Sequence, residues 1–339
     1  FARSAGPRAP PLCRAPAALR PTMGLATELL VAALALAPAA FGVRLQPQPA
    51  GSEDACAIPE GFHVVSVKDS QVGPMKVVVR EEFRKDIISR GLTNRGYWEI
   101  RHPRELGELA GVKMPVNGTF LDIGANLGWY SLLFAKVGYD VIAVEPMAHN
   151  RLALEASLCL NPDIRHRVRL LPVALVAPED TKQRCFLHST PGNRGNGILA
   201  CSADDFARLP CGDAGGPKEC ASEEVKVSTL DALLQEQHVK SVDVAKMDVE
   251  GFECNVLKGG QSLFGRLHVK LLQAETKLKP VEECFDREAK SHKYRMGKGV
   301  GPDGNRVISS LARREEEEEE EEEGELRDKF FVSLTPLVG

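Results

Sequence analysis

Short apolar runs alternate with longer stretches of helical periodicity through the middle of the chain. Short apolar runs are typical of buried strands, whereas apolar residues three or four positions apart are typical of helices. Strands are predicted at residues 119–123, 140–144, 168–173, 242–247 and 269–274. Helices are predicted between them at residues 127–137, 148–160 and 252–257. The alternation predicts an α/β domain with a doubly wound, mostly parallel sheet and helices on both faces.

The alternating region is expected to form one domain over residues 118–280. Residues 51–117 are expected to be an N-terminal extension. Its short strands are predicted at residues 64–67 and 77–79, and its helices at residues 81–90 and 103–110.

One segment inside the predicted domain lacks periodicity. Residues 181–224 are rich in Gly and Cys, and we expect a long loop there. A loop of that size is usually functional or disordered. In this fold it would lie above the carboxyl edge of the sheet, where a substrate lid would be placed.

The N-terminal part of the chain has the composition of a leader. Residues 1–50 open with a segment rich in Arg, Pro and Ala, and an apolar run follows at residues 29–43. That run is short for a bilayer span and suits the apolar core of a signal peptide. We therefore expect entry into the secretory pathway or a membrane-bound organelle. A plastid or mitochondrial address, or a short membrane anchor at residues 29–43, is the alternative.

The C-terminal part is expected to be irregular over residues 281–339. It contains nine consecutive glutamates at residues 315–323, which are typical of a solvated linker. Residues 330–334 are a candidate for a displaced last strand. The net charge is −4, and without the glutamate run the remainder is mildly basic. Neither net charge is extreme, so nucleic acid is not expected as a partner.

The nine cysteines form no recognisable framework. No C-x-x-C pair occurs, and no Cys/His cluster has the spacing of a zinc site. We interpret the cysteines as unrelated thiols. A bridge among Cys201, Cys211 and Cys220 is the alternative in an oxidising compartment.

The first predicted strand of the domain leads into a glycine turn with the sequence DIGANLG, residues 122–128. The G-x-G-x-x-G pattern of a pyrophosphate-binding turn is absent. Asp122 would repel a diphosphate and would favour an ammonium or a hydroxyl group. Together with Gly124, Asn126 and Gly128, it favours a positively charged adenosyl ligand such as S-adenosylmethionine. A turn that only joins a strand to a helix is the alternative.

Two further groups of residues stand at predicted strand ends. Glu145 ends the next strand, where an acidic residue can accept hydrogen bonds from both ribose hydroxyls. Lys246, Asp248 and Glu250 alternate along an extended segment, so they share one face at its carboxyl end. Clustered mixed charges are costly to bury unless they act together. The alternative is that Glu145 caps a helix and that Glu250 and Glu253 lie at a helix N-terminus, where negative charge is favourable. Glu275, at the end of the last strand, would face the same crevice.

The motifs together resemble the FkbM family of methyltransferases over residues 118–276. The matching segments are FLDIGANLGWYS at 120–131, VEP at 144–146 with Asn150, TLD at 229–231, KMDVEGFE at 246–253 and LKG at 257–259. The resemblance implies a class I methyltransferase fold with S-adenosylmethionine as the methyl donor. It places Asp122, Gly124 and Gly128 on the methionine side and Glu145 at the ribose. It implies O-methylation, often of sugars or of hydroxyls on natural products.

A methyltransferase of this type needs a base for the acceptor proton. We expect Asp248 or Glu250 to be that base and Lys246 to orient the acceptor, a small molecule or glycan. No metal site is expected, and Mg²⁺ held by Asp248 and Glu250 is the alternative. Two other functions compete with this hypothesis. A nicotinamide oxidoreductase is disfavoured by Asp122 and the missing glycine pattern, and the irregular C-terminus leaves open a non-catalytic binding protein on a methyltransferase scaffold.

Overall fold

The computed structural model describes residues 56–68, 70–82, 86–190, 193–209, 221–297 and 305–310. The chain divides into two compact units, residues 1–39 and 40–339, and every described residue belongs to the second. Four expectations fall outside the described residues: the leader with its apolar run, the bridges to Cys211 and Cys220, the glutamate run, and a strand at 330–334. Within the described ranges, no helix has the length and apolarity that a bilayer crossing requires.

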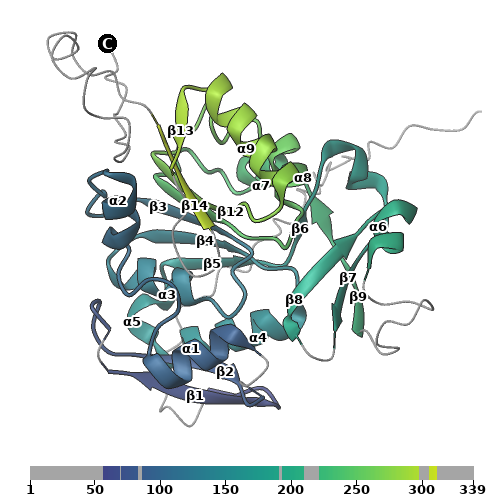
Figure 1. The fold of residues 1–339 in the computed structure, drawn as a ribbon. Helices are drawn as coiled ribbons and strands as arrows, with labels where there is room; N and C mark the ends of the chain where they lie inside the picture. The colour runs from purple at the N-terminus through teal and green to yellow at the C-terminus, as the bar shows by residue number, and fades with distance from the viewer. Residues whose placement is uncertain are drawn as a thin grey trace, which may run out of the picture. The chain divides into compact units, whose positions relative to one another are not determined.

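A seven-stranded sheet forms the centre of the described part of the chain (Figure 1). Its order is β13 (Tyr294–Met296), β14 (Asn305–Ser310), β12 (Leu271–Glu275), β11 (Val244–Met247), β3 (Thr119–Ile123), β4 (Asp140–Val144) and β5 (Val168–Leu171). From β12 to β5 all neighbouring strands are parallel. Strand β14 is antiparallel to both of its neighbours. The expectation of a doubly wound, mostly parallel sheet is confirmed.

Alternate residues of the parallel strands face two different cores. Phe120 and Val244 belong to one apolar cluster, while Leu121 and Ala245 belong to the other. The first cluster is covered by α3 (Trp129–Lys136) and α4 (Ala148–Leu160). The second is covered by α7 (Leu230–Glu236), α8 (Glu253–Lys258) and α9 (Lys279–Ser291). Because both faces are buried, the strands are apolar throughout and lack an alternating pattern.

The N-terminal extension packs on the first core. An antiparallel hairpin of β1 (Phe62–Val67) and β2 (Met75–Arg80) is followed by α1 (Ile87–Arg95) and α2 (Arg104–Ala110). The backbone N–H of Val78 donates to Ser157 Oγ of α4 at 2.8 Å. The helix expected at residues 81–90 begins later in the structure, at Ile87. Asp86 caps α1 by accepting a hydrogen bond from the N–H of Ile88, so the helix begins after it.

The segment expected to be a long loop contains a three-stranded antiparallel sheet. Strands β8 (Asn193–Ala200), β7 (Cys185–Thr190) and β9 (Ala221–Val225) lie in that order, and the short helix α6 (Ala203–Arg208) follows β8. The expectation was wrong because the inward residues of this sheet are few. Leu187 and Leu199 pack in a small third core, and most other positions are polar or glycine.

Two disulfides replace the unrelated thiols that we expected. Cys185 pairs with Cys201 across β7 and β8, and Cys56 pairs with Cys159 of α4. Cys56 and Cys159 are separated by 103 residues and Cys185 and Cys201 by 16, and neither separation matches a recognisable framework, so spacing could not identify the pairs. Cys254 and Cys284 carry free thiols.

The domain also extends past the boundary expected at residue 280. Helix α9 and the strands β13 and β14 extend the ordered domain, so the described residues 281–297 and 305–310 are not an irregular tail. The pattern was missed because β14 carries mostly polar residues, with Ile308 as its fully buried apolar side chain. The remaining short elements are α5 (Pro162–Arg165), a 3-10 helix at Pro178–Lys182, and a parallel pair of β6 (Ala174–Leu175) and β10 (Val227–Ser228).

Candidate active site

A pocket opens at the carboxyl ends of β3, β4, β11 and β12. The sequence-predicted residues that line it are Asp122, Gly124, Asn126, Glu145, Lys246, Asp248, Glu250 and Glu275. Gly128 does not line it. This residue stands at the start of α3 with φ of 83°, and a Cβ there would lie 2.2 Å from Leu154. It therefore allows α3 and α4 to pack closely.

The turn after β3 forms the floor of the pocket. Gly124 has φ of 81°, and its N–H donates to the carbonyl of Val144 at 2.9 Å. A Cβ at this position would lie only 1.8 Å from the carbonyl oxygen of Asp248. Glycine is thus required where the ends of β3, β4 and β11 converge, because the backbone after β11 leaves no room for a Cβ.

Asp122 is fully buried beneath this turn. Its Oδ2 accepts a hydrogen bond from Ser131 Oγ at 2.7 Å, while Oδ1 has no partner among the described residues. Burial raises the pKa of this carboxyl. Asn126 Oδ1, further along the turn, is likewise buried without a described partner. The pocket floor therefore offers two buried acceptors to a ligand that brings hydrogen-bond donors.

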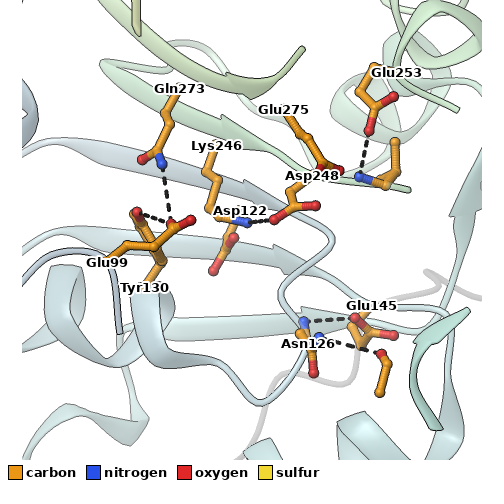
Figure 2. Close-up of polar contacts among 12 residues, drawn as sticks. Glu99, Asp122, Asn126, Tyr130, Glu145, Lys246, Asp248, Glu253, Gln273 and Glu275 are labelled. Atoms are coloured by element: carbon orange, nitrogen blue, oxygen red, sulfur yellow. Dashed lines mark hydrogen bonds and ion pairs between the residues drawn. The ribbon is translucent and has the colours of Figure 1, made fainter. Parts of the chain in front are cut away.

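Glu145 is held rigidly at the end of β4 (Figure 2). Its Oε2 accepts the N–H of Asn126 at 2.7 Å, and its Oε1 accepts the N–H of Met147 at 2.8 Å. The side chain is 4% exposed, and burial raises its pKa to about 7. Each carboxylate oxygen has a second lone pair, so the fixed group can also accept from two hydroxyls of a ligand.

These residues fit S-adenosylmethionine. The ammonium of its methionine part is the kind of donor that Asp122 Oδ1 and Asn126 Oδ1 lack. Its ribose has a pair of hydroxyl groups that Glu145 could accept hydrogen bonds from. It carries no phosphate, which the two carboxylates would repel.

A buried ion pair lies next to this floor. Lys246 Nζ is 2.8 Å from Asp248 Oδ2, and the lysine is 7% exposed. Burial lowers the pKa of Lys246, but the carboxylates of Asp248, Asp122 and Glu99 outweigh burial and raise it overall. Burial acts to raise the pKa of Asp248, and the charge of Lys246 overcomes this and lowers it. Both groups are therefore ionised near neutral pH.

Three carboxylates gather above the ion pair. Oxygens of Asp248, Glu250 and Glu275 lie within 4.8 Å of one another. Desolvation, and then repulsion from Asp248 and Glu275, raises the pKa of Glu250 to about 8. Lysine charges already pair with the cluster, Lys246 with Asp248 and Lys277 with Glu275 at 2.9 Å.

Sequence reasoning assigned Glu253 only to a helix N-terminus. Its Oε1 accepts the N–H groups of Val249 at 3.0 Å and Gly251 at 3.2 Å, so it fixes the loop that carries Glu250. The side chain is 1% exposed, and burial raises its pKa to about 7. The capping pattern was visible in the sequence, but its effect on the loop was not.

Sequence reasoning missed Glu99, Tyr130 and Gln273 altogether. The Tyr130 hydroxyl donates to Glu99 Oε2 at 2.6 Å, and Gln273 Nε2 donates to the same oxygen at 3.3 Å (Figure 2). No local motif marks Glu99, which reaches the pocket from the N-terminal extension. Tyr130 lies within the matched segment at 120–131 and Gln273 within a predicted strand, and no residue pattern gives either of them a role in the site.

The small sheet contributes a wall of the pocket. The carbonyl of Gly195 in β8 accepts from Asn150 Nδ2 at 3.1 Å and from Asn126 Nδ2 at 3.4 Å. Leu187, Gly197 and Leu199 also line the pocket. The segment expected to lie over the carboxyl edge does lie there, as strands instead of a loop.

Fold and comparison together define the class of protein. The sheet is that of a class I, Rossmann-like methyltransferase, and residues 122–315 match the model of the methyltransferase FkbM domain. This match covers more than half of the chain. The protein belongs to the FkbM methyltransferase family.

Solved structures resemble the chain only distantly. The METTL16 methyltransferase domain is 12% identical with a TM-score of 0.40, covering 78% of this chain and 93% of that one. A methyltransferase from Geobacter sulfurreducens is 17% identical with a TM-score of 0.37, covering 68% of this chain and 87% of that one. No curated protein sequence matches the chain.

Proposed function

We propose that the protein transfers the methyl group of S-adenosylmethionine to a hydroxyl group of a sugar or another small molecule. The observation that carries the proposal is the shared pocket. Asp122, Glu145 and the Asp248–Glu250 pair line one pocket, at the carboxyl ends of three adjacent strands. Ligands of doubly wound sheets bind at this edge.

The floor of the pocket is assigned to the donor. Asp122 and Asn126 would bind its ammonium, and Glu145 would bind its ribose hydroxyls. The donor supplies an electrophilic methyl group on a positively charged sulfur. The residues around it hold the two reactants in line and exclude water, which is most of what methyl transfer requires.

Glu250 is assigned as the base. A base works best when its pKa lies near the working pH, and the pKa of Glu250 is about 8. Asp248 is a weaker candidate, because its ion pair with Lys246 keeps its pKa low. The acceptor proton goes to Glu250 as the new O–C bond forms and the S–C bond breaks. Lys246 and Asp248 position the acceptor oxygen.

The test measures S-adenosylhomocysteine released from S-adenosylmethionine with a panel of hydroxylated acceptors. The full chain should release it, and Glu250→Gln should lose turnover while it keeps donor binding. Equal turnover by Glu250→Gln would remove the assigned base. A folded chain that binds no donor would favour the non-catalytic binding protein.

The two disulfides support a further part of the proposal, folding in an oxidising compartment. Disulfides persist in the secretory pathway and are rare in reducing compartments. Cys56–Cys159 joins the N-terminal extension to α4, and Cys185–Cys201 joins β7 to the residue that follows β8. Thiol counting on protein isolated from its native source tests this, since four reactive thiols at these positions would contradict it.

A further inference from the structure

Glu99 lines the pocket although it lies before the segment that matches the family model. That segment begins at residue 122, whereas Ile87, Ile88, Trp98 and Glu99 come from the N-terminal extension and complete one wall. Glu99 alone among these four carries a charge. Its part of the wall is therefore a feature of this chain's extension and not of the matched domain.

The backbone at Glu99 is bent to point the side chain inward. Its φ is 53°, in the left-handed region, and the N–H of Ile100 donates across it to the carbonyl of Trp98 at 2.6 Å. Three-residue turns of this hand are rare and strained. The carbonyl of Ile100 accepts from Trp129 Nε1 of α3 at 3.0 Å, which fixes the turn against the core. Strain of this kind persists mainly at functional sites.

The carboxylate of Glu99 is connected to the reaction centre. Tyr130, whose hydroxyl donates to Glu99, has its ring 5.2 Å from Lys246 Nζ, which in turn pairs with Asp248. Burial, and then the charge of Glu99, raises the pKa of Tyr130 far above its usual value, so its hydroxyl stays a donor. Glu99 is thus held in one position beside the place where the acceptor must lie.

The charges of this end of the pocket are unequal. Four carboxylates line it, and two lysines accompany them: Glu99, Asp248, Glu250, Glu275, Lys246 and Lys277. Both lysines already form ion pairs with members of the group. Below its pKa of about 8, Glu250 is mostly protonated, and the other three carboxylates still outnumber the two lysines. A phosphate or carboxylate on the acceptor would therefore meet net repulsion, whereas hydroxyl and amino groups can donate to the carboxylates.

We propose that Glu99 binds the acceptor and selects molecules that carry hydroxyl or amino groups against molecules that carry an anionic group. The inference rests on the proposed function, because it assigns this end of the pocket to the acceptor. Glu99 is a specificity-determining residue in this account, and Glu250 keeps the role of the base.

The experiment uses four probes of one carbon skeleton: glucose, glucosamine, glucuronate and glucose 6-phosphate. Their binding to the full chain is measured by NMR titration with S-adenosylhomocysteine at saturation. The wild type should bind glucose and glucosamine at least about 10-fold more tightly than the two anions. Glu99→Gln should reduce this selectivity ratio, the affinity for glucose or glucosamine divided by the affinity for either anion, to about threefold or less.

Two further variants separate selection from folding. Glu108→Gln changes an exposed glutamate of α2 outside the pocket and should keep the wild-type ratio. Glu99→Gly accepts the left-handed backbone without strain, so it should remain folded, as circular dichroism checks, and should still lose the selectivity.

The results that overturn the inference are specific. They are an unchanged ratio in Glu99→Gln, anions bound as tightly as glucose by the wild type, or no probe bound by protein that binds S-adenosylhomocysteine. In each of these cases the proposed function stands. Failure to bind S-adenosylhomocysteine would overturn both proposals.

Discussion

Glu145 Oε2 accepts the backbone N–H of Asn126 at 2.7 Å, which joins the end of β4 to the turn after β3. The bond fixes the carboxylate and the turn with respect to each other before any ligand arrives. Because Glu145 is buried at 4% exposure, its negative charge is costly when no ligand donates to it. A ligand that donates hydrogen bonds to it would offset this cost.

The stability of the ligand-free protein should therefore fall as pH rises. The folded-state pKa of Glu145 is about 7, against 4.5 for an ordinary glutamate, so the folded state binds more protons between these values. Stability contributed by the protonated form is present below pH 4.5 and is lost as pH rises to about 7. The loss for this one group is about 3 kcal/mol.

Chemical denaturation at several pH values between 5 and 8 checks this prediction. Glu145→Gln removes the titrating group, and its stability should depend less steeply on pH than that of the wild type. Exposed Glu155→Gln on α4 serves as the control and should keep the wild-type slope. Parallel slopes for the wild type and Glu145→Gln would contradict the buried-charge account.

The rate of methyl transfer should depend on the ionisation of Glu250. A base must be deprotonated, so kcat/KM should rise about tenfold per pH unit below pH 8 and level off above it. Glu250→Gln should lower kcat by about 10² to 10⁴-fold and remove the inflection. An inflection near pH 8 that survives in Glu250→Gln would assign it to another group.

Removal of the Cys185–Cys201 disulfide should affect both stability and the pocket. The two cysteines are separated by 16 residues, for which the chain-entropy model gives about 3 kcal/mol. Cys185→Ser with Cys201→Ser should also weaken donor binding, because Leu187 and Leu199 of the same strands line the pocket. Urea denaturation and donor titration measure the two effects.

The second disulfide supplies the matched control. Cys56 and Cys159 are separated by 103 residues, and their double serine variant should lose about 4–5 kcal/mol. Neither residue lines the pocket, so donor affinity of the folded fraction should not change. If both double variants lose affinity equally, the small sheet has no particular role in the site.

The parallel sheet and most of the pocket could be predicted because their signals are local. Gly124, Glu145 and Asp248 each stand at the end of an apolar strand, and parallel strands bring their carboxyl ends to one edge. The sequence alone therefore predicts that these three residues meet at one edge of the sheet.

The features that the sequence did not predict depend on packing between segments that are distant in the chain. Glu99 enters the pocket through a strained turn that no residue pattern marks. Strand β14 pairs with β12 despite its mostly polar sequence, because the neighbouring strands supply its backbone hydrogen bonds and Ile308 packs in the core. Sheet β8–β7–β9 buries few side chains, so it left no periodic signal.

Calorimetric titration of S-adenosylmethionine into the full chain tests the central claim most directly, with Glu145→Gln and Glu155→Gln as the paired variants. The account predicts saturable binding by the wild type and by Glu155→Gln. Glu145→Gln should bind about 10 to 100-fold more weakly, the cost of one hydrogen-bonded charged group. Equal binding by all three proteins, or none by a wild type whose circular dichroism shows it folded, would contradict the assignment of this pocket to the donor.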